Sequence, residues 1–215
     1  MRMIFPALVL VAACAGEPAL ASNARFTAAI SGGSLGVGPE VGIRANDYVG
    51  ARGDAGFLNI AHSFASDDLR YRGRVRLKSI GGMADLYPFG NGFRISAGAR
   101  RNWNKGHISA MPSRNTSVGR MTYTPQQIGT IEGDAITKKW APALTIGYAG
   151  KNRSGFVFGA EAGAFFQGRI RIGRFTNSTG MISAADLEEE RTALQSDVNH
   201  YKVYPVLRLS AGYRF

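Results

Sequence analysis

The C-terminal segment 203–215 alternates between apolar and polar side chains, and this period constrains the fold more than any other feature of the chain. Apolar residues occupy its odd positions: Val203, Pro205, Leu207, Leu209, Ala211, Tyr213 and Phe215. Its even positions are mostly polar or small and include Arg208, Ser210, Gly212 and Arg214. A period of two indicates a β-strand with one apolar face. The segment is also long enough for a tilted strand that crosses a membrane, which needs about 9–11 residues.

Seven further segments alternate in the same way, so the sequence predicts eight strands. They lie at about 24–31, 34–44, 48–64, 69–87, 93–109, 137–150 and 156–174. The connections after the second, fourth and sixth strands are short, whereas those after the fifth and seventh span about 110–136 and 175–200. This asymmetry is typical of outer-membrane barrels, which have short periplasmic turns and longer external loops. We therefore predict an all-β fold, an eight-stranded antiparallel up-and-down transmembrane β-barrel.

A soluble β-sandwich or a lipocalin-like barrel is the alternative fold, because its strands alternate as well. Two features disfavour it. Aromatic residues lie at strand ends, as in the girdles of membrane barrels. They are Trp140, Tyr148, Phe156, Phe166, Tyr213 and Phe215. Charged residues also share a face with glycines, which a narrow lumen requires and a water-facing surface does not.

The N-terminus has the pattern of a secretory signal peptide. A positive start with Arg2 precedes a short apolar stretch, and Ala19-Leu20-Ala21 provides an A-x-A cleavage site. We predict a signal peptide over residues 1–21 and a mature barrel domain over residues 22–215. The alternative is a lipoprotein signal in which Cys14 is lipidated. With cleavage after Ala21 the mature chain has no cysteine, and therefore neither a disulfide nor a thiolate site.

The chain is strongly basic, with a formal net charge of +11. Arg2 and Glu17 cancel within the predicted signal peptide, so the mature chain keeps this charge. A basic balance raises nucleic acid as a partner, but an exported chain rarely meets it, so we expect no nucleic acid. Basic charge also suits a membrane surface rich in anionic head groups. No internal apolar run reaches about 18 residues, which excludes membrane-spanning helices.

The interior of an eight-stranded barrel is only just wide enough to be filled by side chains. Glycines on the predicted inner face make room for long residues: Gly36, Gly38, Gly42, Gly50, Gly98, Gly147, Gly159, Gly163 and Gly212. The same face carries the predicted lumen charges: Glu40, Arg52, Asp54, Arg94, Arg100, Glu161 and Arg208. Buried charges must be paired. We therefore predict a carboxylate–guanidinium network that plugs the barrel and excludes a wide pore.

The fourth predicted strand carries a row of basic residues at every second position: Arg70, Arg72, Arg74, Arg76 and Lys78. One interpretation is an anion path, or a contact with lipopolysaccharide phosphates near the outer rim. The other is that the upper half of the row projects into water while the lower half pairs with lumen acids, because charge rows are usually solvated. Asp85 is out of phase with this row, and we expect a β-bulge near Gly81-Gly82 to absorb the slip.

Residues 183–199, in the last predicted external loop, have a helical pattern. Ser183 and Asp186 resemble a capping box, and acidic residues suit the start of a helix. The segment contains Asp186, Glu188, Glu189, Glu190 and Asp197. A solvated loop helix is one interpretation, and an acidic lid over the basic loops, or a partner contact, is the other.

Few residues offer catalytic or metal chemistry. The histidines are His62, His107 and His200, and no HExxH, paired-cysteine or phosphate-loop motif is present. We therefore expect no metal and no cofactor. His107 and Ser109 have the H-x-S spacing of a lipid A deacylase-like pair and would share the outer face of a strand, with Glu132 as the nearest candidate for the orienting acid. This pair is a weak catalytic candidate, and we expect no enzyme.

The whole pattern resembles the small outer-membrane β-barrel proteins of Gram-negative bacteria. These include the transmembrane domain of outer membrane protein A, the outer membrane protein W family and the opacity-type porin family. The resemblance rests on Ala19-Leu20-Ala21, on the strand alternation and on Gly212, Tyr213 and Phe215, which resemble the C-terminal assembly signal. It implies a monomer in the cell outer membrane, with outer-membrane lipid, lipopolysaccharide and the barrel-assembly machinery as partners. Because the predicted last strand reaches Phe215, we expect no peptidoglycan-binding domain of the kind found in full-length outer membrane protein A.

The sequence leaves three functions open. The first is a non-enzymatic structural or surface-interaction role for an integral outer-membrane barrel. The second is a narrow porin-like channel for small or anionic solutes. The third is a lipid A-modifying acyl hydrolase that uses His107 and Ser109.

Overall fold

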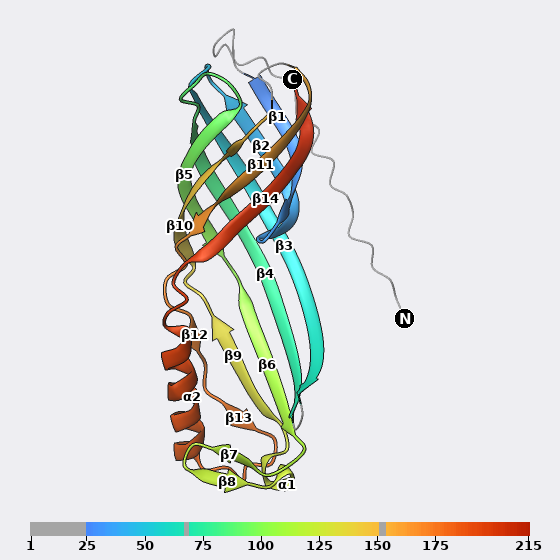
Figure 1. The fold of residues 1–215 in the computed structure, drawn as a ribbon, viewed down its shortest axis with the longest axis vertical. Helices are drawn as coiled ribbons and strands as arrows, with labels where there is room; N and C mark the ends of the chain where they lie inside the picture. Colours follow the sequence, from blue (N-terminus) through green and yellow to red (C-terminus); the bar gives the residue numbers. More distant parts are fainter. Residues whose placement is uncertain (1–24, 67–68, 151–153) are drawn as a thin grey trace, which may run out of the picture.

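The computed structural model of the protein describes residues 25–66, 69–150 and 154–215 and contains a closed ring of eight antiparallel strands (Figure 1). The ring strands, in order, are β1 (Arg25–Gly33), β2 (Gly36–Arg44), β3 (Val49–Ser66), β4 (Leu69–Leu86), β5 (Phe93–Asn102), β10 (Trp140–Tyr148), β11 (Gly155–Phe165) and β14 (Tyr204–Arg214). Each pairs with the next, and β14 pairs with β1 to close the ring. The predicted all-β architecture with eight strands in one ring is confirmed; the predicted signal peptide lies outside the described residues.

Closure of the ring rests on β1. Its pairing with β14 runs from Thr27 opposite Arg214 to Gly33 opposite Arg208, and the Phe215 amide donates to the Phe26 carbonyl at 2.9 Å. The tight turn from β1 to β2 contains Ser34 and Leu35, and Gly36 follows with φ 97°, a conformation that favours glycine. A turn of two residues is therefore enough to connect β1 to β2, and β1 forms a full strand.

Two ring strands are much longer than their neighbours. β3 and β4 each have 18 residues, whereas β2 has 9 and β5 has 10. Beyond the rim, β4 pairs with β6 (Lys105–Pro112), and the sheet continues through β9 (Ile131–Ile136) to β12 (Arg171–Ile172) and β13 (Thr176–Asn177). The result is an open sheet, hereafter the extension, that projects from the ring at the end opposite the C-terminus (Figure 1).

Two predicted strands are shorter than expected. The segment 93–109 is interrupted at Trp103 and Asn104, where the Lys78 amide donates to Asn104 Oδ1 at 2.9 Å. The two parts, β5 and β6, both pair with β4 but take different second neighbours, β10 and β9. The segment 156–174 likewise ends its ring strand at Phe165.

The long connections contain further structure. The first holds β7 (Thr116–Val118), β8 (Met121–Tyr123) and α1 (Pro125–Ile128), and the second holds α2 (Ala184–Val198). The expected helix is thus present, and Ser183 caps it by accepting from the Asp186 amide. α2 runs along the side of the extension rather than across the mouth of the ring (Figure 1). In the described part of the chain, neither helix is long and apolar enough to cross a membrane.

A belt of exposed apolar side chains surrounds the ring. It includes Phe26, Ile30, Val41, Ile95, Leu144, Ile146, Phe158, Leu207 and Leu209. Phe158 is 71% exposed and Leu209 is 69% exposed, far more apolar surface than a soluble monomer presents in one place. At the C-terminal edge, the Tyr213 ring centroid lies 5.6 Å from that of Phe156 and 5.1 Å from that of Phe215. The outside of the ring therefore has the character of a lipid-facing surface.

The expected bulge in β4 is wrong. Pairing with β3 is continuous from Val49 opposite Leu86 to Ser66 opposite Leu69. β4 therefore keeps the same two faces along its whole length. Its even positions face outward, and its odd positions from Ser79 to Asp85 face inward.

We expect two adjacent glycines of β4 to respond oppositely to substitution. A Cβ at Gly81 would lie 2.7 Å from Arg100 Nη1 and 2.9 Å from its Cγ, whereas a Cβ at Gly82 would meet nothing within 4 Å. Gly81→Val should lower the free energy of unfolding by about 1–3 kcal/mol through overpacking. Gly82→Val, the matched control, should leave it unchanged or raise it. Urea unfolding in lipid vesicles measures both, and equal effects would contradict the assigned faces.

Candidate functional site

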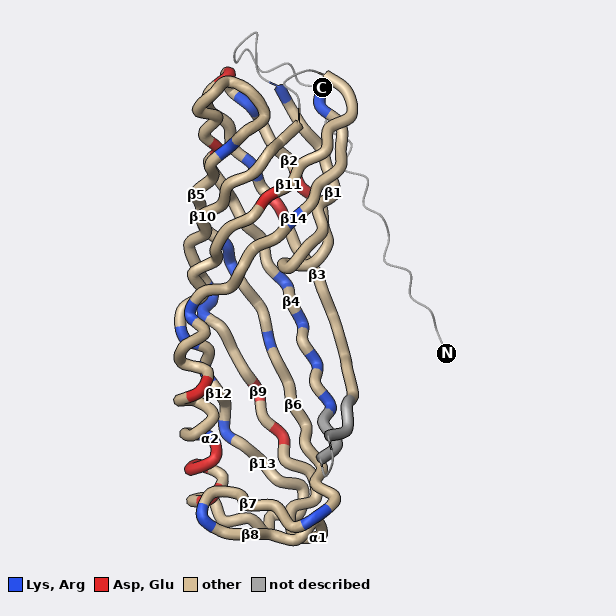
Figure 2. The backbone as a smooth tube through the Cα atoms, viewed as in Figure 1, with Lys and Arg blue, Asp and Glu red and all other residues tan. Residues whose placement is uncertain are grey.

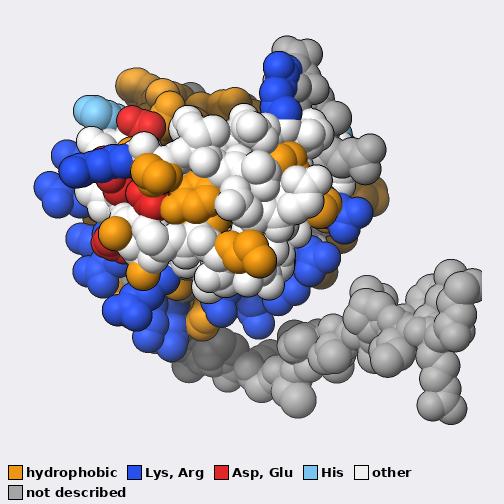
Figure 3. Space-filling view, turned by 90° about the horizontal axis from the view of Figure 1, so that it is seen from below, with side chains coloured by type: hydrophobic (Ala, Val, Ile, Leu, Met, Phe, Trp, Pro, Cys, Tyr) orange, Lys and Arg blue, Asp and Glu red, His pale blue; other side chains and the backbone are white. Residues whose placement is uncertain are grey.

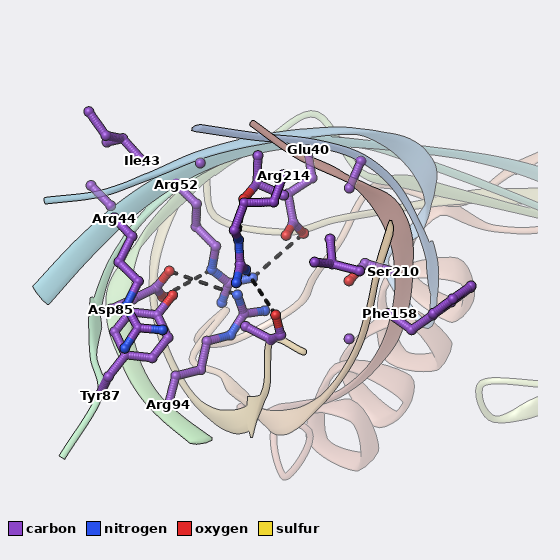
Figure 4. Close-up of a pocket in the computed structure, with 17 residues that line it drawn as sticks. Glu40, Ile43, Arg44, Arg52, Asp85, Tyr87, Arg94, Phe158, Ser210 and Arg214 are labelled. Carbon is purple, nitrogen blue, oxygen red and sulfur yellow. Dashed lines mark hydrogen bonds and ion pairs between the residues drawn. The ribbon is translucent and has the colours of Figure 1, made fainter. Parts of the chain in front are cut away.

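The interior of the ring is organised around Arg52. Its guanidinium contacts carboxylates from three other strands: Nη2 lies 2.5 Å from Glu161 Oε2, Nε 3.1 Å from Asp85 Oδ1 and Nη1 3.7 Å from Glu40 Oε2. These partners belong to β11, β4 and β2, so one side chain ties together walls that face each other across the lumen. Figure 4 shows Arg52, Arg94, Asp85 and Glu40 directed inward, while Ile43 and Phe158 point away.

The ion pairs around Arg52 belong to one continuous network. Arg208 bridges Glu40 at 3.0 Å and Asp54 at 3.2 Å, and Arg100 reaches Asp54 at 2.6 Å. Arg94 lies 2.8 Å from Glu161 and 3.9 Å from Asp85. The members are buried: Glu40, Arg52, Asp54, Asp85, Arg94, Arg100, Glu161 and Arg208. Four arginines face four carboxylates, so the formal charge of the network is zero.

The structure brings together all seven residues predicted for the lumen and adds Asp85, which sequence reasoning missed. The sequence does contain a signal for Asp85, which lies at an odd position of β4, whereas the basic row lies at even positions. If the strand keeps one register, Asp85 faces the side opposite to the basic row, which is the lumen. Three serine hydroxyls also join the network and were not predicted. Arg208 donates to Ser31 at 2.5 Å, Arg100 donates to Ser79 at 3.0 Å, and Ser96 donates to Asp85 at 2.5 Å.

Other side chains close the lumen above and below the network. Towards the C-terminal end, Arg44 donates to backbone carbonyls of Asn46 and Asn91, and its guanidinium stacks 3.7 Å from the Tyr87 ring centroid. Towards the extension lies a buried apolar layer: Leu35, Met83, Ala141, Ala143, Phe165 and Val206. The free space beside the network is about 30 Å³, room for only one or two water molecules. The lumen is therefore filled at three levels.

The basic row lies outside the lumen. Arg72, Arg74, Arg76 and Lys78 are exposed on the outward, even face of β4; the side chain of Arg70 lies outside the description. The expectation that the lower half of the row pairs with lumen acids is therefore wrong, because β4 does not change phase. Figure 2 shows these cations at alternate positions of β4 beyond the ring. Neighbours in such a row, about 6.6 Å apart, repel by roughly 0.6 kcal/mol even in water.

Aromatic residues flank the row at the rim. The Arg101 guanidinium lies 4.9 Å from the Trp103 ring centroid and 6.0 Å from that of Trp140, and Lys78 Nζ lies 5.7 Å from Trp103. On the neighbouring strand β6, Lys105 is paired with Arg76 and shares its face. Seen from the extension end, Lys and Arg side chains gather around part of the molecular edge (Figure 3).

The possible catalytic pair is only partly assembled. His107 Nδ1 lies 2.8 Å from Asp134 Oδ1, so the acid beside the histidine is Asp134 and not Glu132, which pairs opposite Ser109. In the described residues Ser109 makes no hydrogen bond to His107. An activated nucleophile needs that contact, so this geometry does not favour acyl transfer.

The acidic helix α2 is anchored through Asp186. The carboxylate accepts from Tyr123 Oη at 2.5 Å, from Ser183 Oγ at 2.7 Å and from the Arg120 amide at 3.2 Å. The Tyr123 and Ser183 hydroxyls hold the pKa of Asp186 below its usual range. An apolar cluster of Val118, Ile128 and Ile182 packs beside it and fixes the tip of the extension.

We expect acid to release α2. Because the folded pKa of Asp186 is lowered, its stabilisation is present above the usual carboxyl pKa and is lost as the pH falls through the folded value. A spin label at Ala193 should gain mobility over that range. Asp186→Asn should already be mobile at neutral pH, while Asp197→Asn, the control, should behave as the wild type. Unchanged mobility in Asp186→Asn would contradict the anchor.

We expect adjacent arginines on β5 to differ sharply. Arg100 is 2% exposed and holds Asp54, whereas Arg101 is exposed and faces outward. Arg100→Gln leaves a buried carboxylate short of a partner and should cost about 3–5 kcal/mol of unfolding free energy. Arg101→Gln should cost about 1 kcal/mol or less, the size of an exposed cation–π contact. The temperature at which the compact form is lost on gels compares them, and a similar loss for both would contradict the network.

Comparisons with known proteins find the same fold. Comparison with protein-family models and with curated protein sequences gives no match. The solved structure of Acinetobacter baumannii CarO2 matches with a TM-score of 0.62 and 19% identity, covering 89% of this chain and 98% of that one. Acinetobacter baumannii CarO matches with a TM-score of 0.57 and 17% identity, covering 89% and 97%. The chain therefore has a CarO-like β-barrel fold.

Proposed function

We propose that this chain is an integral outer-membrane β-barrel protein with a structural or surface-interaction role and no enzymatic activity. The ring is the membrane anchor, and the extension is the part presented to the outside of the cell. The apolar belt supports the first assignment, because that much exposed apolar surface needs lipid to cover it. The fold shared with Acinetobacter baumannii CarO2 and CarO supports a barrel of this kind.

The filled lumen is the observation that favours a structural role over a channel. Eight buried charges pair across the ring. Phe165, which is 1% exposed, belongs to the apolar layer on the extension side of them. A solute would have to break several buried ion pairs to pass. The basic row offers no anion path, because it lies on the outer face of β4.

The strand connections support the orientation. On the C-terminal side, short connections join β2 to β3 and β4 to β5, as periplasmic turns do. On the other side lie the extension, α2 and the apolar cluster at its tip (Figure 1). We propose that this second side faces outward and presents a rigid surface, with both long connections folded into it.

We expect purified protein in planar lipid bilayers to give no stepwise ion conductance. A variant that combines Arg52→Ser, Arg94→Ser and Phe165→Ala removes the plug and should conduct. Its conductance would show that the barrel inserts in this assay. Arg101→Ser, which removes an outward cation, is the matched control and should stay silent. Stable conductance steps from the wild type would overturn the structural role in favour of the narrow channel.

A further inference from the structure

We propose that the outer face of the extension binds the phosphate groups of lipopolysaccharide. The site, hereafter the basic face, consists of Arg72, Arg74, Arg76 and Lys78 on β4 with Lys105 on β6. This inference rests on the proposed function, since it requires the ring to be inserted in an outer membrane.

The basic face begins where the apolar belt ends. On the outward side of β4, Ile80 is 53% exposed and Leu86 is 50% exposed, and the next outward position beyond Ile80 is Lys78. Lys78 pairs with Phe57 on β3, which in turn pairs with Val37 at the start of β2. Lys78 therefore lies at the rim, where the ring strands stop. The hydrocarbon boundary and the first cation coincide along this strand.

Tryptophans mark the same level. Trp103 and Trp140 lie close to Arg101, and Trp103 also lies close to Lys78. Tryptophan concentrates at the boundary between hydrocarbon and head groups. The remaining cations of the basic face must then lie in the head-group region, where lipopolysaccharide carries phosphates on its glucosamine units and on its inner core sugars.

The spacing of the row fits a ligand with phosphates at several depths. A strand advances by about 3.3 Å per residue, so cations at every second position are about 6.6 Å apart and Arg72 lies roughly 20 Å beyond Lys78 along the strand. Lys105 widens the row sideways, because it shares its face with Arg76 on the adjacent strand. Arginine can hold a phosphate with two parallel hydrogen bonds.

The cations of the basic face differ from those of the lumen network in their partners. The four arginines of the lumen network each pair with a carboxylate, but in the described part of the chain no acid forms an ion pair with Arg72, Arg74, Arg76, Lys78 or Lys105. The nearest acid across β6, Asp134, is engaged by His107. Phosphate groups of the surrounding lipid would supply negative charge to this face.

The test is binding of bisphosphorylated lipid A to the detergent-purified protein. The triple variant Arg72→Ser, Arg74→Ser and Arg76→Ser should bind about tenfold or more weakly than the wild type, since each cation near an anionic surface contributes. The matched control removes three exposed cations outside the basic face: Arg120→Ser, Arg174→Ser and Lys202→Ser. It should bind as the wild type does. Dephosphorylated lipid A should not distinguish the three proteins.

The outcomes separate this inference from the proposed function. All three proteins should insert in vesicles and run as heat-modifiable barrels; failure of the wild type to do so would refute the membrane role itself. With insertion intact, wild-type affinity in the triple variant, or an equal loss in the control, would overturn the basic face. Equal binding of phosphatidylglycerol would identify a general anionic head-group surface instead. Displacement of lipid A by millimolar inorganic phosphate would indicate a free-phosphate site. Either this displacement or equal binding of phosphatidylglycerol would overturn the assignment to lipopolysaccharide.

Discussion

The contact of Arg52 with three carboxylates is the constraint on which the rest of the ring depends. A buried guanidinium is tolerated only when opposite charge surrounds it, and here that charge comes from β2, β4 and β11. Those strands must therefore keep their register and stagger, and their neighbours must be small where the arginines pass. Gly81 against Arg100 is one such place. The network is neutral as a whole and fills the middle of the ring.

The second constraint is the unequal length of the strands. Because β3 and β4 continue beyond β2 and β5, the sheet is no longer closed beyond the rim. There β6 pairs with β4, and β9 pairs with β6. The outward face of β4 does not change, so one strand passes from an apolar belt into a basic row without a bulge. This continuity places the cations at the edge of the belt. The same sheet, with α2 at its side, forms the surface that we propose faces the outside of the cell.

Alternation was enough to predict much of this architecture. The odd positions of β14, from Pro205 to Tyr213, are exposed, and the seven charged residues expected in the lumen are buried. What alternation could not reveal was long-range pairing. Asp85 was left out because its phase was attributed to a bulge, and the interruption at Trp103 and Asn104 depends on the distant β10 and β9. Likewise Asp134 reaches His107 only through the pairing of β6 with β9, which no local pattern encodes.

The most direct test of the account is the environment of single spin labels on the outer surface, compared between oxygen, which dissolves in lipid, and a water-soluble nickel complex. Labels replacing Leu207, Leu209 and Ile80 should collide mainly with oxygen, and labels replacing Arg76 and Arg74 should collide mainly with nickel. The change should occur between Ile80 and Lys78, which are adjacent outward positions of β4. Dominant nickel access at Leu209, or oxygen access that continues to Arg74, would contradict a membrane ring that ends where the basic face begins.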